Sequence, residues 1–134
     1  MTRRDRLRVL LACGFIAAGL LHLISPRLYR PIMPAYLPAH DLLIAISGVA
    51  EIAGGIGLLV PGLRRFAGWG LLLLLLAVFP ANVEMLRLYR SRGVVWWGEA
   101  LLWLRLPFQL VLAWWVRQAA QERAVRAEAP VYGD

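Results

Sequence analysis

Four long apolar segments alternate with short polar or proline-rich segments along the chain. They cover about residues 7–25, 42–60, 66–86 and 96–116, and each holds roughly the twenty residues that a helix needs to cross a bilayer. Because a chain within lipid must satisfy its backbone hydrogen bonds internally, these segments are expected to be α-helices. The pattern therefore predicts an all-α fold, an antiparallel bundle of four transmembrane helices forming one membrane domain over residues 1–134.

The connections between the segments differ in character. The turn between the second and third segments, at residues 61–65, is short enough to join two adjacent antiparallel helices. The connection over residues 26–40 has prolines at positions 26, 31, 34 and 38, which exclude a long helix, but is otherwise largely apolar and aromatic. We predict that it forms an ordered cap at the depth of the lipid headgroups. Residues 117–134 are predicted to be a polar tail.

Composition and charge agree with a membrane protein. Hydrophobic residues make up 60% of the chain and the mean hydropathy is +0.63, too apolar for a soluble domain of this size. The net charge of +7 is carried by arginines, most of which flank the apolar segments. They indicate membrane topology and contact with lipid headgroups rather than nucleic-acid binding. With both termini in the cytoplasm, nine arginines lie on the cytoplasmic side and five on the outer side. This bias favours that topology, because cytoplasmic loops carry an excess of arginine and lysine.

Two charged residues lie deep within apolar segments, Glu51 in the second and Arg105 in the fourth. A charge in mid-membrane costs at least about 2.5–3.5 kcal/mol, so such residues face the bundle interior and pair. Counted at about 1.5 Å per residue from the outer helix ends, the two lie at one depth. We therefore predict that Glu51 and Arg105 pair, with His22 and Asn82 about 10 Å or more above them.

Helical spacing extends this polar cluster. Gln109 shares a face of the fourth segment with Arg105, and Ser47 shares a face of the second with Glu51. The predicted cluster lines one cavity that opens outward beneath the cap, and it consists of His22, Glu51, Asn82, Arg105 and Gln109. Two alternatives stay open at this point. The charged pair would also serve as a structural clamp between helices, and His22 as a hydrogen-bonded packing residue.

Prolines and small residues predict local features of the helices. Pro80 and Pro107 each leave the carbonyl four residues earlier without its helical donor. We expect a kink or another donor near Pro80, and Arg105 or Gln109 as the donor near Pro107. The stripe of Gly14, Ala18 and His22 is expected to let another helix approach closely. The glycines of the second segment are expected to do the same, rather than to cradle a cofactor.

Several kinds of chemistry find no support in the sequence. A single cysteine, Cys13, excludes an internal disulfide and a redox-active thiol pair. His22 and His40, without thiols or a close acidic set, do not predict a metal site. No serine, histidine and acid arrangement indicates a hydrolase. We therefore predict no catalytic residue and expect that the chain is not an enzyme on its own.

Four segments, in order, resemble the DoxX-like family of small four-helix bacterial membrane proteins over roughly residues 14–116. They are GLLHLISPRLYRPIMPAYLP, SGVAEIAGGIGLLVPGLRRFAGWG, VFPANVEM and LRLPFQLVLAWW. The most specific pieces are the spacing of His22 and Pro26, SGVAE around Glu51, FPAN ending at Asn82, and RLP before Gln109. The family takes its name from a membrane subunit of a thiosulfate:quinone oxidoreductase, and other members look like partners of redox enzymes.

The resemblance implies a protein of the bacterial cytoplasmic (inner) membrane that acts near the quinone pool. It suggests that His22, Glu51, Asn82 and Arg105 serve that role, with quinone as the candidate cofactor. Three functions stay open: a subunit that recruits or supports a redox enzyme, a quinone- or small-oxyanion-binding oxidoreductase component, and a small-molecule or lipid carrier. The expected partners are the lipid bilayer and a soluble or membrane redox enzyme, and a homo-oligomer stays open. Glu84 departs from the family pattern, where relatives have an uncharged residue.

Overall fold

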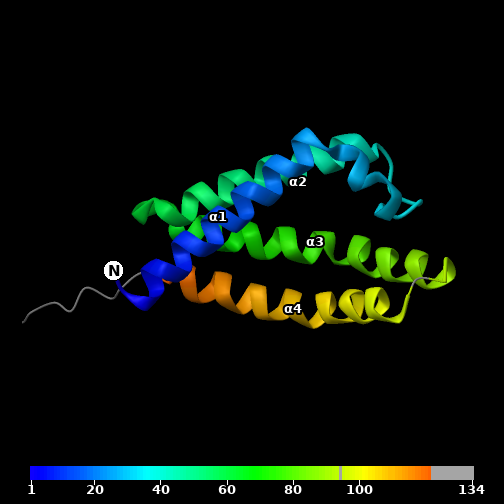
Figure 1. The fold of residues 1–134 in the computed structure, drawn as a ribbon. Helices are drawn as coiled ribbons and strands as arrows, with labels where there is room; N and C mark the ends of the chain where they lie inside the picture. Colours follow the sequence, from blue (N-terminus) through cyan, green and yellow to red (C-terminus); the bar gives the residue numbers. More distant parts are fainter. Residues whose placement is uncertain (94, 122–134) are drawn as a thin grey trace, which may run out of the picture.

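The fold is a bundle of four long helices, described by a computed structural model for residues 1–93 and 95–121 (Figure 1). The helices are α1 (Arg3–Ile24), α2 (His40–Leu59), α3 (Arg64–Ser91) and α4 (Trp96–Ala120). Three short 3₁₀ turns connect them: η1 (Pro26–Leu28), η2 (Arg30–Ile32) and η3 (Pro61–Leu63). The prediction of an all-α four-helix bundle is confirmed.

All four helices are long and apolar enough to cross a membrane, so the chain is a multi-pass membrane protein. The observed helices lie close to the predicted segments, although α3 extends to Ser91 and α4 to Ala120. The predicted polar tail falls mainly on residues 122–134, which lie outside the described residues.

The helices run up and down in sequence and form two close pairs. α1 packs most extensively on α2, and α3 on α4, while α2 also contacts α3 (Figure 1). The start of α1, the α2–α3 turn and the end of α4 lie at one end of the bundle, which we call the terminal end. The segment between α1 and α2 and the α3–α4 turn lie at the other end.

Glycines set the distance between α1 and α2. A Cβ atom added to Gly48 would lie 2.8 Å from the carbonyl oxygen of Gly19, and one added to Gly55 would lie 2.9 Å from that of Ala12. No side chain fits between backbones at that separation, so these positions require glycine. The expectation that the glycines of α2 serve helix packing is confirmed.

The face of α1 that meets α2 is not the one expected from the sequence. A Cβ added to Gly14 would meet nothing within 4 Å, and both Gly14 and Ala18 line the cavity described below. The close approach instead uses Gly19, which lies on a different face of the helix. The prediction that the stripe of Gly14, Ala18 and His22 receives a neighbouring helix is therefore wrong for Gly14 and Ala18, whereas His22 Cβ does pack against Gly48.

The apolar core lies toward the terminal end of the bundle, where all four helices contribute. Its buried side chains are Leu11, Phe15, Leu58, Leu71, Leu75, Val116 and Ala119. At the opposite end, residues 25–39 form the compact proline-rich connection that the sequence predicted, and η1 and η2 contact α1, α2 and α3. Arg30 forms a bidentate ion pair with Asp41, with 2.7 Å between Nη2 and Oδ2, and Ile32 is buried. These contacts confirm an ordered cap.

Arg8 joins the first helix to the end of the last one. The residue is only 5% exposed, and its guanidinium donates to the carbonyl oxygens of Ala119 at 2.8 Å and Gln121 at 2.7 Å. It also pairs with Asp5 at 3.0 Å. Because the last carbonyls of a helix have no intrahelical donor, this arginine caps α4.

Replacing Arg8 with methionine should lower the free energy of unfolding by about 2–3 kcal/mol, because charge-assisted hydrogen bonds to the end of α4 are lost. Unfolding by sodium dodecyl sulfate in mixed micelles, followed by circular dichroism, measures the change. Arg4→Met is the matched control, since Arg4 is exposed and forms no hydrogen bond within the described part of the chain. Equal losses in the two variants would contradict a capping role.

Candidate functional site

Glu51 is paired with His22. The carboxylate Oε2 lies 2.7 Å from His22 Nδ1, and the two side chains are only 14% and 13% exposed. An ionised carboxylate only accepts hydrogen bonds, so Nδ1–H of the imidazole is the donor when Glu51 is charged. The contact holds α1 to α2 beside the glycine pair described above.

The predicted direct pair of Glu51 with Arg105 is wrong. Both residues are described, and no hydrogen bond or ion pair joins them. The depth expected for His22 is also wrong, because packing places its Cβ against Gly48, one helical turn or about 5 Å from Glu51. The predicted depth came from counting residues from the helix ends, and such a count does not depend on how α1 crosses α2. The side chains of His22 and Glu51 are long enough to meet across one helical turn.

Arg105 belongs to a second hydrogen-bonded group, between α3 and α4. Its Nε donates to Asn82 Oδ1 at 3.0 Å, and Asn82 Nδ2 donates to Gln109 Oε1 at 2.8 Å. Gln109 Nε2 in turn donates to the carbonyl oxygen of Leu75. Because the guanidinium only donates and the carbonyl only accepts, the orientation of both amides between them is fixed. Asn82 and Gln109 are 9% and 8% exposed.

Pro80 and Pro107 lie inside α3 and α4, and the expected side-chain donors do not reach the carbonyls that the prolines free. α3 continues through Pro80, and the side-chain donor found nearby goes to the carbonyl of Leu75, one residue before the one that Pro80 frees. Near Pro107, neither Arg105 nor Gln109 donates to the carbonyl of the residue four positions earlier. Both side chains turn to α3 instead, where Asn82 offers an acceptor and a donor.

The two polar groups border one cavity of about 450 Å³ within the bundle. Four of the five predicted site residues line it, and its apolar walls come from α1, α3 and α4. The lining residues are Glu51, Asn82, Arg105 and Gln109 with Leu10, Leu11, Gly14, Phe15, Ala18, Leu75, Val78, Phe108 and Leu112. His22 is not among them, because it lies behind Glu51. The structure thus brings the predicted residues together as two hydrogen-bonded groups at a shared cavity.

The cavity opens sideways, between α1 and α4. Leu10 lines it and is 65% exposed, Phe108 lines it and is also exposed, and the space beside Gly14 is open. Among the described residues, none of the cap contributes to the lining. The expectation of an opening beneath the cap is therefore wrong. The opening instead lies on the side that faces lipid when the helices span a membrane.

Tyr29 is a site residue that the sequence analysis did not identify as one. Its ring lies against the imidazole of His22, with centroids 3.9 Å apart and planes at 57°. Burial raises the pKa of the Tyr29 hydroxyl above its ordinary value; the charge of Glu51 raises it further, whereas that of Arg105 lowers it. Tyr29 therefore stays a neutral phenol. The feature of the sequence that indicates this contact is Pro26, because a turn there folds the chain back over the end of α1.

Several other polar residues of the helices lie apart from the cavity. Ser47 Oγ donates to the carbonyl of Ile44 in its own helix. Glu84 pairs with Arg87 at 3.1 Å and Glu99 pairs with Arg90 at 3.0 Å, near the α3–α4 turn. Within residues 1–93 and 95–121, no cluster of three or more His, Cys, Asp or Glu side chains is placed to hold a metal ion.

The cavity offers one cationic donor and one anionic acceptor. Arg105 uses Nε for Asn82 and directs Nη1 at the sulfur of Met85, 3.9 Å away, while Nη2 forms no hydrogen bond within the described residues. Glu51 likewise uses one carboxylate oxygen for His22. The arrangement can therefore bind a small molecule that is largely apolar and carries hydrogen-bond acceptors.

Comparison with known proteins identifies a family but no function. A family model described as a domain of unknown function (DUF8561) matches residues 11–120, from within α1 to the end of α4. The chain therefore belongs to that family. No curated protein and no solved structure matches the chain.

Proposed function

We propose that this member of the DUF8561 family is a membrane subunit of a redox system and binds the headgroup of a quinone in the cavity between α1 and α4. One observation carries the proposal: a membrane-embedded cavity combines apolar walls with a polar end at Arg105 and Asn82 and opens sideways between two helices. A quinone is an apolar ring with two carbonyl acceptors, and it reaches a protein through the bilayer. The redox assignment rests on the sequence resemblance to the DoxX-like family.

The residues present fit such a headgroup. The unused Nη2 of Arg105 would donate to one quinone carbonyl, while Asn82 holds the guanidinium in position through Nε. Phe15 and Phe108 line the same cavity and would contact the ring. When bound, a quinone supplies two-electron acceptor chemistry. Glu51 presents a carboxylate oxygen to the same space, and His22 holds that carboxylate from behind.

The proposal includes a partner and a location. The resemblance to the DoxX-like family supports a separate redox enzyme that would exchange electrons with the quinone, and a chain with one cysteine has no internal disulfide to do so. The bias of arginines supports placing the terminal end in the cytoplasm, in the inner membrane of a bacterium. The enzyme would then meet the bundle at one of its two membrane surfaces.

A short-chain quinone should raise the melting temperature of the purified protein in detergent by a few degrees, since a ligand that binds only the folded state stabilises it. Arg105→Ala should abolish the rise while the bundle stays folded. Gly14→Leu should also abolish it, because the added side chain would fill open space at the wall of the cavity. Circular dichroism during heating measures both effects.

The matched control is Gly70→Leu, at a glycine of α3 that also has open space around it but does not line the cavity. It should keep the response to quinone. An undiminished response of Gly14→Leu would contradict binding in this cavity. A response to thiosulfate instead of quinone would favour a small-oxyanion site at Arg105. If no ligand acts and Arg105→Ala unfolds the protein, the polar cluster is a structural clamp.

A further inference from the structure

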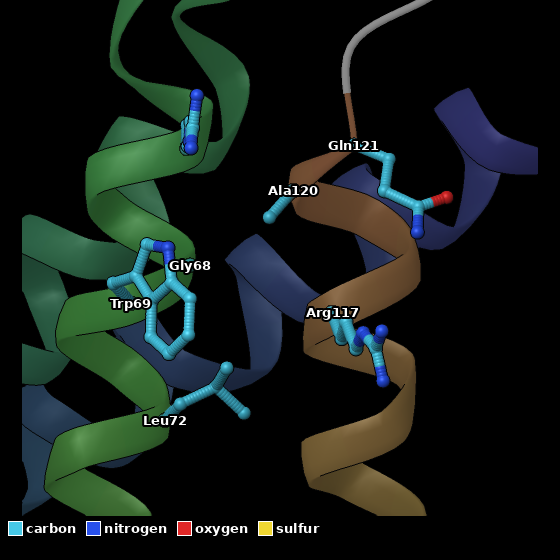
Figure 2. Close-up of a pocket in the computed structure, with 7 residues that line it drawn as sticks. Gly68, Trp69, Leu72, Arg117, Ala120 and Gln121 are labelled. Atoms are coloured by element: carbon cyan, nitrogen blue, oxygen red, sulfur yellow. The ribbon is translucent and has the colours of Figure 1, made fainter.

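A second hollow lies at the terminal end of the bundle, between α3 and α4, away from the cavity described above. It has a volume of about 360 Å³, and Figure 2 shows its two walls. Trp69 and Leu72 lie on the α3 side, and Arg117 and Gln121 lie on the α4 side. Arg65, Gly68 and Ala120 complete the lining, which contains no acidic residue among those described.

The floor of this groove is a close contact between the two helices. A Cβ added to Gly68 would overlap the Cβ of Ala120, so the backbones meet here and the larger side chains stand on either side. Trp69 is 63% exposed and forms an apolar wall next to the contact. The groove therefore joins an apolar surface, which faces the hydrocarbon, to a rim at the end of the helices.

The rim carries two arginines that have no partner among the described residues. Arg65 lies in the first turn of α3 and Arg117 in the last turn of α4. Neither forms a hydrogen bond or ion pair within residues 1–93 and 95–121. Two guanidinium groups at one groove, with no carboxylate between them in the part of the chain that the structure describes, attract a phosphate.

The end of α4 would ordinarily oppose an anion, because the last carbonyls of a helix carry partial negative charge. Here Arg8 donates to the carbonyls of Ala119 and Gln121, and its positive charge offsets part of the negative charge at that end of the helix. The buried arginine thus weakens the repulsion of an anion next to the groove, in addition to capping α4.

We infer that this groove binds one anionic phospholipid, with the phosphate between Arg65 and Arg117 and an acyl chain along Trp69 and Leu72. A lipid satisfies both parts of the groove at once, because its headgroup matches the two cations and its chain covers the apolar wall. Tryptophan beside arginine at a helix end also matches the interfacial depth at which phosphates lie. The inference is independent of the quinone cavity.

Native mass spectrometry of the intact protein in neutral detergent tests the site, with phosphatidylglycerol and phosphatidylcholine of identical acyl chains as probes. The wild type should retain one phosphatidylglycerol in preference to phosphatidylcholine. The double variant Arg65→Gln/Arg117→Gln should bind phosphatidylglycerol at least about tenfold more weakly, since each arginine near an anionic surface contributes about a factor of five. Arg65→Lys/Arg117→Lys should keep most of the preference and shows that the fold is intact.

Arg3→Gln/Arg4→Gln is the matched control, because it removes the same charge at the same end of the bundle but outside this groove. It should leave the preference nearly unchanged. Equal losses in the two glutamine variants would overturn the inference in favour of diffuse charge attraction. Equal retention of both lipids by the wild type, or displacement of the lipid by inorganic phosphate alone, would overturn it as well.

Discussion

Gly19→Ala will push α1 away from α2 and destabilise the protein by about 1–3 kcal/mol, toward the upper end of that range. The added methyl group would overlap the carbonyl oxygen of Gly48 and approach Ile52 Cγ1 to 2.8 Å and Glu51 Cβ to 3.1 Å. A backbone oxygen cannot move aside as a flexible side chain can. The helices must therefore separate, and in lipid their association depends on close packing together with hydrogen bonds between helices, such as that of His22 with Glu51.

Unfolding by sodium dodecyl sulfate in mixed micelles measures this loss, with Gly14→Ala and Gly70→Ala as matched controls. Both control glycines have open space where the methyl group would go. They should be neutral or slightly stabilising, because alanine favours a helix over glycine. A Gly19→Ala protein as stable as the controls would show that α1 and α2 are farther apart than the structure places them.

The same contact shows why the sequence predicted the site residues better than their partners. Glu51 and Arg105 are conspicuous because a charge within an apolar segment must be compensated. Which partner compensates it depends on how each helix is rotated and where the helices cross. Gly19 and Gly48 determine that crossing, and they bring His22 within reach of Glu51. Counting residues from helix ends contains no such information.

Residues whose role depends on distant backbone were the hardest to predict. Arg8 lies among other arginines at the start of the chain, and nothing local separates it from them. Its role appears only when the fold places it beside carbonyls more than a hundred residues away, at Ala119 and Gln121. Tyr29 is similar, because its contact with His22 requires the cap to fold back over α1.

The helices and the cap were predictable for the opposite reason. Apolar segments of about twenty residues have one stable form in lipid, and prolines at short intervals have few folded forms. A polar side chain, in contrast, has several possible hydrogen-bond partners within reach. Gln109 was predicted to belong to the cluster, yet its acceptor was not, since the carbonyl of Leu75 is not one that either proline frees.

Asn82→Leu should destabilise the protein by about 2–4 kcal/mol, because Asn82 is the link between Arg105 and Gln109. The change leaves Gln109 Oε1 without its donor in a buried position and takes the acceptor from Arg105 Nε. An unsatisfied buried group such as Gln109 Oε1 costs about 1–3 kcal/mol, and the lost charge-assisted hydrogen bond of the more exposed Arg105 adds the rest. The same variant should lose its response to quinone at temperatures where it remains folded, because nothing then positions the guanidinium.

A double-mutant cycle with Gln109→Leu distinguishes this network from ordinary packing. If the two amides act as one unit, Asn82→Leu/Gln109→Leu should cost less than the sum of the single variants, because the second change removes the group that the first one left unpaired. Independent packing residues would instead give additive losses. Asn82→Asp adds a second test: it still accepts from Arg105 but cannot donate to Gln109, so it should keep the quinone response better than Asn82→Leu. Equal loss of the response in both variants would mean that Asn82 does more than position Arg105.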